Sequence, residues 1–73
     1  MKTSEVLKTI TNVLKVEIDE NTMKVDVPSW DSLKHIQLIM ELEEKFGVEI
    51  PIEKVPDIDS VSILLKLIEA EEG

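Results

Sequence analysis

One segment near the middle of this chain of 73 residues carries a complete set of helix signals, and it limits the folds open to the chain. Pro28 disfavours helix in the residue before it, and both Asp31 and Ser32 can accept hydrogen bonds from the free N–H groups of a first helical turn. Gly47 is a typical left-handed helix stop, and a proline follows four residues later. Between these signals the apolar residues recur at spacings of three and four, the pattern of an amphipathic helix: Leu33, Ile36, Ile39, Met40, Leu42 and Phe46. The sequence therefore predicts a helix over residues 33–46 that starts at Asp31 or Ser32.

Ser32 lies where this predicted helix begins. Unpaired N–H groups and the helix dipole make the start of a helix a favourable place for a phosphate group. The hydroxyl of Ser32 is therefore well placed to carry a phosphodiester. Capping alone also explains the local pattern, because serine and aspartate are common at ordinary helix starts. On these few residues, both interpretations stay open.

Two more amphipathic segments predict helices at either end of the chain. The first covers residues 4–15, and its apolar residues share one face: Val6, Leu7, Ile10, Val13 and Leu14. The last covers residues 61–70 and is capped by Asp59 or Ser60. Its inward-facing residues are expected to be Val61, Leu64, Leu65 and Ile68.

The rest of the chain predicts one long connection and one short helix. Residues 16–31 lack helical periodicity and are longer than most loops, so we expect an ordered crossover held by apolar anchors: Val16, Ile18, Met23, Val25 and Val27. Residues 52–55 can make little more than one turn before Pro56 interrupts it. The predicted fold is all-α, a four-helix bundle with three longer helices, one short helix and a long first loop. Residues 1–73 are expected to form a single domain.

The composition excludes several classes of function. No cysteine is present, so any thiol chemistry must come from an attached group. The net charge of −8 argues against nucleic acid as a partner, and the excess is uneven, with six acids and five lysines in residues 1–40 and ten acids and three lysines in residues 41–73. No apolar stretch reaches the roughly 18 residues of a membrane span. We expect a soluble, cytoplasmic monomer that docks basic partners through its acidic half.

The chain also lacks a recognisable catalytic or metal-binding group of residues. His35 is the only histidine, but a bundle this small offers little room for a substrate cleft, so we expect His35 on the surface rather than paired with Ser32 as a base. Asp57 cannot begin an EF-hand loop, because the positions that require glycine and glutamate hold Ser62 and Ile68. We expect neither an enzyme nor a metal site.

The run Trp30-Asp31-Ser32-Leu33 and residues 38–51, LIMELEEKFGVEIP, resemble the acyl carrier protein family, and the resemblance covers nearly the whole chain. It implies that a phosphopantetheinyl transferase moves 4′-phosphopantetheine from coenzyme A to Ser32. The thiol of that arm would then hold an acyl group as a thioester and present it to partner enzymes. The resemblance further implies that Asp31 caps the helix and contacts the transferase, and that Leu33 lies beside the attached arm.

The same helix is expected to provide the docking surface for acyl-loading and acyl-processing enzymes with basic surfaces. Residues three and four apart lie on the same flank of a helix. Leu33, Gln37, Met40 and Glu44 have these spacings, so they are expected to form one flank. Apolar anchors mixed with charge are typical of recognition helices. The predicted partner-binding residues are Ile36, Gln37, Met40, Glu43 and Glu44.

The chain also departs from the family pattern. Lys34 and Gln37 stand where fatty-acid carriers commonly have acidic residues, and Trp30 stands where they have a small one. We therefore expect a carrier of a specialised pathway, such as polyketide, modified-sugar or lipid assembly. An aminoacyl or peptidyl carrier and a helical adaptor that carries no group are the alternatives. Ile63 and Leu64 replace the small residues of the family, which predicts either short or polar cargo or a long chain that is left exposed.

Overall fold

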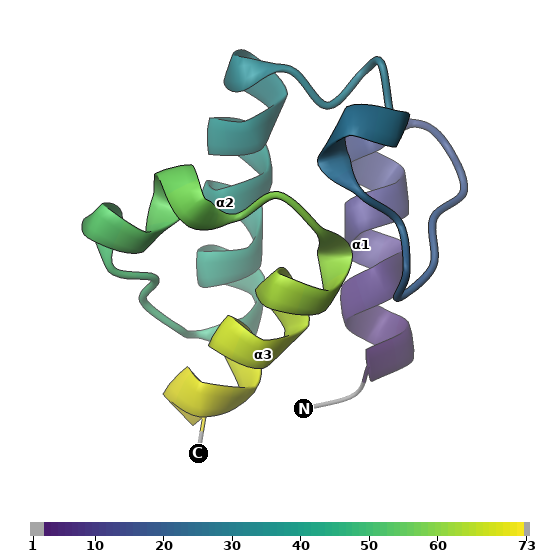
Figure 1. Ribbon diagram of the computed structural model, residues 1–73. Helices are drawn as coiled ribbons and strands as arrows, with labels where there is room; N and C mark the ends of the chain where they lie inside the picture. The colour runs from purple at the N-terminus through teal and green to yellow at the C-terminus, as the bar shows by residue number, and fades with distance from the viewer. Residues whose placement is uncertain (1–2, 73) are drawn as a thin grey trace.

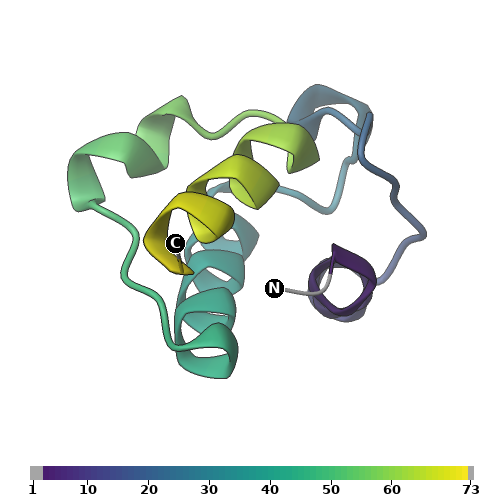
Figure 2. The ribbon, with the colours of Figure 1, turned by 90° about the horizontal axis from the view of Figure 1, so that it is seen from below.

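The computed structural model describes residues 3–72 as three α-helices and two short 3₁₀ helices. α1 and α2 lie side by side, and α3 crosses them obliquely, between α1 and the second 3₁₀ helix (Figures 1 and 2). The expected all-α fold with three longer helices is confirmed. The elements, in chain order, are α1 (Thr3–Leu14), η1 (Lys24–Asp26), α2 (Ser32–Phe46), η2 (Ile52–Asp57) and α3 (Val61–Glu72).

The core is aliphatic apart from one indole ring. Each α-helix buries a stripe of residues spaced by three and four, as the sequence pattern predicts. A side chain of this size stabilises the fold by about 1.5–3 kcal/mol when it is fully buried. The side chains with no exposed surface are Val6, Ile10, Leu14, Leu38, Leu42, Val61, Leu64 and Ile68.

Local capping sets both ends of α2. The side-chain Oδ1 of Asp31 accepts a hydrogen bond from the Lys34 N–H at 2.8 Å. At the other end, Gly47 adopts a left-handed conformation with φ 65° and ψ 34°, and its N–H donates to the Glu43 carbonyl. The predicted start and stop of this helix are confirmed, and the cap is Asp31 rather than Ser32.

Hydrogen bonds to backbone carbonyl groups hold the crossover between α1 and α2. The Ser29 hydroxyl donates to the Leu14 carbonyl at 2.7 Å. Earlier in the crossover, the Lys24 N–H donates to the Asp59 carbonyl at 2.8 Å. The Val61 N–H donates to the Thr22 carbonyl at 3.0 Å, so the crossover is tied to the start of α3. The expectation of an ordered crossover is correct.

The expected apolar anchors of the crossover are only partly correct. Val27 is buried and Ile18 packs against the core. Val16 and Met23 are more than one third exposed, and Val25 is 86 % exposed. The physical reason is that backbone pairing with the start of α3 carries the attachment, so the side chains of Met23 and Val25 are not needed in the core.

The short helix and two helix ends also differ from the prediction. Pro56 does not end the short helix, because the Lys54 N–H donates to the Pro51 carbonyl at 2.9 Å and the Ile58 N–H donates to the Val55 carbonyl at 3.2 Å. Neither bond uses the N–H that proline lacks, so the 3₁₀ turns continue past it. α1 ends one residue earlier than predicted, because Lys15 has a left-handed φ of 64°. α3 continues two residues beyond the predicted end. Within residues 3–72, no helix is long and apolar enough to span a membrane.

Candidate functional site

Ser32 is the first residue of α2 and is exposed. Because Asp31 supplies the side-chain cap, the Ser32 hydroxyl does not serve as the cap. The first turn of α2 contains no acidic residue, so the carboxylate of the preceding Asp31, which accepts the Lys34 N–H, is the local acid at this positive end of the helix. An exposed hydroxyl in this position fits a covalent phosphodiester.

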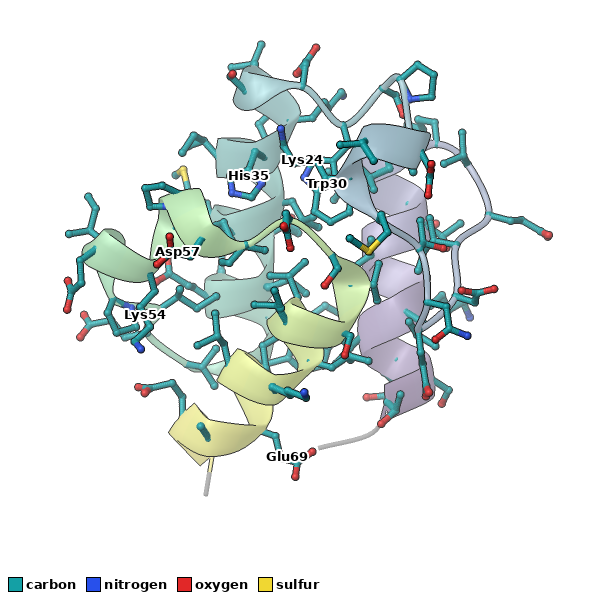
Figure 3. The ribbon with its side chains drawn as sticks, in the orientation of Figure 1. Lys24, Trp30, His35, Lys54, Asp57 and Glu69 are labelled. Atoms are coloured by element: carbon teal, nitrogen blue, oxygen red, sulfur yellow. The ribbon has the colours of Figure 1, made fainter. Side chains whose placement is uncertain are left out.

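A chain of buried hydrogen bonds lies beneath Ser32. The Trp30 side chain is 2 % exposed and that of His35 is 7 % exposed. The Trp30 Nε1–H donates to His35 Nδ1 at 2.9 Å, and His35 Nε2 lies 2.9 Å from the Val55 carbonyl oxygen. Since Nδ1 must accept from the indole, these partners assign the imidazole to the neutral tautomer with its hydrogen on Nε2. Figure 3 shows Trp30 and His35 together where the crossover meets α2.

The expectation that His35 lies on the surface is therefore wrong. A buried imidazole is tolerated when both ring nitrogens have partners, and Trp30 and Val55 provide these partners. The same contacts leave no ring nitrogen to accept a proton from Ser32. His35 holds the structure around the serine and does not activate it.

The predicted docking residues lie on the surface of α2, with one difference among them. Leu33 is 68 % exposed, Met40 62 % and Ile36 48 %, and Gln37 and Glu44 are also exposed. Large apolar side chains exposed together on a small protein are typical of an interaction surface. The structure brings Leu33, Ile36 and Met40 to the surface of the helix that begins at Ser32.

Glu43 differs because the fold already uses its carboxylate. It is half-buried, and its Oε2 accepts the Ile50 N–H at 2.8 Å. This bond ties the last turns of α2 to the segment that leads into η2. Glu44, in contrast, is exposed and is the better placed of the two for an electrostatic contact.

Two hollows on the η2 side of α2 share the side chain of Ile36. The first, of about 560 Å³, contains Ser32 and Lys24 in its walls. The second, of about 410 Å³, is mostly apolar and lies further along α2. Its apolar lining is Ile36, Ile39, Met40, Ile50, Pro51, Ile52 and Val55, and Glu43 and Glu49 complete it. Both volumes are in the range of small-molecule sites. No group of three or more residues that could hold a metal ion is found within residues 3–72.

Sequence reasoning did not find the partners of His35 or the position of Lys24. Trp30 and His35 are five residues apart, but Trp30 precedes the helix, so no helical periodicity connects them. Val55 takes part through its carbonyl group, which every residue possesses. The one signal in the sequence is that the only tryptophan and the only histidine flank Ser32.

Comparison with known proteins agrees with this geometry. The family model described as "Phosphopantetheine attachment site" matches residues 4–68. Acyl carrier proteins of three bacteria are similar in sequence. The protein of Wolinella succinogenes is 38% identical over 84% of this chain and 80% of its own, and that of Helicobacter pylori strain 26695 is 45% identical over 80% and 74%. The protein of Helicobacter hepaticus is 35% identical over 99% of this chain and 100% of its own.

The class defined by fold and site is thus a phosphopantetheine attachment domain. Within that class, the chain belongs to the acyl carrier protein family. Members of this family are carriers and not enzymes, and they hold 4′-phosphopantetheine covalently. The expected family, prosthetic group and absence of enzymatic activity are confirmed.

Two solved structures share the fold at 20% sequence identity. The holo acyl carrier protein of Geobacter metallireducens superimposes with a TM-score of 0.82, over 96% of this chain and 84% of that one. A chain in the structure titled "The ishigamide ketosynthase/chain length factor" superimposes with a TM-score of 0.79, over 94% and 90%. Both likenesses support the all-α carrier fold.

The hydrogen bond between Trp30 and His35 predicts a strong energetic coupling. In Trp30→Phe the buried Nδ1 of His35 loses its donor, which costs about 1–3 kcal/mol in addition to the lost packing. In a double-mutant cycle with His35→Leu, urea unfolding should give a coupling energy of about 0.5–3 kcal/mol. Additive losses in the double variant would contradict a shared hydrogen bond.

Proposed function

We propose that Ser32 is the residue that carries the phosphopantetheine arm of this acyl carrier protein. The observation that carries the proposal is the exposed hydroxyl at the first position of α2, released from capping by Asp31. Two further facts support it. Ser32 lies inside the matched residues 4–68, and it lines a hollow large enough for an attached chain.

In the proposed attachment step, Ser32 Oγ loses its proton and forms a bond to the phosphorus transferred from coenzyme A. The bond from that phosphorus to the adenosine-containing half of coenzyme A breaks, and that half leaves. The N–H groups of the first turn of α2, apart from that of Lys34, which Asp31 accepts, stabilise the phosphodiester that results. When attached, the arm supplies a terminal thiol that holds an acyl group as a thioester. Asp31 orients the start of α2 for the transferase.

Attachment is expected at Ser32 alone. After incubation with coenzyme A and a broad-specificity transferase, the wild-type mass should rise by one phosphopantetheinyl group, and the mass of Ser32→Ala should not change. Ser32→Ala should fold normally, because the cap of α2 is Asp31.

Ser62→Ala is the matched control for this experiment, since Ser62 is also in the first turn of a helix, α3. It should be modified as fully as the wild type. An unmodified wild type, or a modified Ser32→Ala, would refute the assignment of Ser32.

We further propose that the protein serves a specialised pathway rather than general fatty-acid synthesis. Lys34 and Gln37 in the first turns of α2 support this, because they reduce the negative charge there. The likeness to a chain in a ketosynthase/chain length factor structure makes polyketide assembly the first pathway to examine. An aminoacyl or peptidyl carrier is the alternative, and loading the modified protein with acyl-transferring and aminoacyl-adenylating enzymes in parallel distinguishes the two.

Docking to basic partner enzymes is expected to depend on Glu44. Charge reversal in Glu44→Lys should slow transfer from the cognate loading enzyme about tenfold at low ionic strength, because steered association depends on surface charge. The difference should shrink as salt is added, since the Debye length is only about 8 Å at physiological ionic strength.

Two variants control the docking experiment. Glu71→Lys makes the same charge change in the last turn of α3 and should have a smaller effect. Glu43→Gln removes a charge but keeps an oxygen that can accept the Ile50 N–H, so it separates docking from folding. If neither added salt nor Glu44→Lys changes the transfer rate, docking is not electrostatic.

The cargo is expected to be short or polar, or to lie on the surface. Leu64 has no exposed surface and Ile63 packs against the core, so branched side chains fill the interior. A long chain could enter only by displacing them. With a two-carbon and an eight-carbon acyl group on the arm, backbone amide spectra should be the same at Leu42, Leu64 and Ile68. Large shifts there with the longer chain alone would show sequestration and refute the small-cargo proposal.

A further inference from the structure

The hollow that contains Ser32 has a cationic side chain in its wall. It is formed by the crossover, the first turns of α2, the end of η2 and the residues before α3. Lys24 is half-buried in it, and Figure 3 shows Lys24 close to His35 and Trp30. The Lys24 backbone is fixed on both sides, because its N–H donates to the Asp59 carbonyl at 2.8 Å and its carbonyl accepts the Val27 N–H at 3.1 Å. The ammonium group therefore extends from a rigid support.

Lys24 is the cation that the walls of this hollow offer to a phosphate on Ser32. The nitrogens of Trp30 and His35 are occupied by each other and by the Val55 carbonyl. Asp59, also in the wall, is a carboxylate and repels a phosphate. The chain carries a net charge of −8, so most of its surface repels the phosphodiester on Ser32. A nearby ammonium therefore has a large effect on the position that the phosphodiester takes.

The same hollow offers a role for Val25, an apolar side chain that is exposed to solvent. Val25 is 86 % exposed, yet it lines the hollow beside Lys24. The other apolar residues of the wall are Trp30, Ile36, Pro56 and Ile58. In phosphopantetheine, the carbon next to the phosphate-bearing CH₂ carries two methyl groups. The Lys24 ammonium can pair with the phosphate, and the exposed methyl groups of the adjacent Val25 can contact the two methyl groups of the arm.

We propose that Lys24 and Val25 form a seat for the first part of the prosthetic arm, on the crossover side of α2. Lys24 pairs with the phosphodiester, and Val25 and Ile36 contact the geminal methyl groups. The inference rests on the proposed attachment at Ser32, and it adds the side of the helix on which the arm lies. The seat directs the arm toward the η2 side and the second hollow, which shares Ile36.

Lys34 provides a charge-matched control on the opposite side. It lies in the same first turn of α2, but it lines a separate hollow between α1 and α2, together with Asn12, Val13 and Lys15. Lys24→Gln and Lys34→Gln each remove one positive charge near Ser32. If only overall charge mattered, both would have the same effect on the phosphodiester.

The test uses the modified chain of 73 residues, with mass spectrometry to establish attachment first. In the wild type, nuclear Overhauser contacts should join the geminal methyl protons to the methyl protons of Val25 and Ile36. Lys24→Gln should weaken these contacts and move the phosphorus resonance, whereas Lys34→Gln should leave both unchanged. Lys24→Arg should restore the wild-type spectrum, because it keeps the charge. Circular dichroism of each variant confirms that the helices are retained.

Several results would overturn the proposal. Contacts from the methyl groups to Lys34 or Gln37, or no contacts at all, would place the arm on the other side or in solvent. Equal responses to the two glutamine variants would show that only net charge acts. In each of these cases attachment at Ser32 still stands. A wild type that gains no mass refutes the attachment and this seat together.

Discussion

The buried hydrogen bonds from Trp30 through His35 to the Val55 carbonyl join three segments of the chain. They hold the end of the crossover, the first turn of α2 and η2 in one arrangement. In a medium of low polarity, removing one partner leaves the next one without a hydrogen bond, so the three groups stabilise each other. Ser32 stands between Trp30 and His35 in the chain, and its position relative to η2 depends on this connection.

α2 packs against the core with one face, exposes apolar side chains on the other, and presents Ser32 at its first position. Its buried side contributes Leu38 and Leu42 to the core, and its exposed side presents Leu33 and Met40. The first turn has no acidic residue, while most of the negative charge lies in residues 41–73. Glu44 lies twelve residues along α2 from Ser32, about 18 Å away at the rise of an α-helix, so a phosphate on Ser32 is beyond the Debye length of about 8 Å from it. Asp31 and Asp59, in contrast, lie close to Ser32.

The small core explains why the sites are at the surface. Branched aliphatic side chains fill the space between the helices, and protein interiors of this density leave few internal voids. The crossover is held by backbone bonds from Thr22 and Lys24 to the start of α3, so its side chains are available to line a hollow. Lys24 and Val25 can face the attachment residue because the fold does not need them inside.

The sequence alone determined the elements whose signals are local. The bounds of α2 follow from Asp31 at one end and Gly47 at the other, since a cap and a left-handed stop act within a turn of the residue concerned. The buried stripes follow from spacing, and the position of Ser32 follows from the same helix start. The family resemblance rested on these local features.

Tertiary structure decided the rest, because the partners are distant in sequence or are backbone groups. His35 is buried because a carbonyl 20 residues away and a tryptophan outside the helix satisfy its ring. Val25 is exposed because the neighbouring Lys24 backbone pairs with Asp59. The carboxylate of Glu43 is occupied by an N–H seven residues on. Periodicity reports which face of a helix is apolar, but it holds no information on which remote group will meet a polar atom.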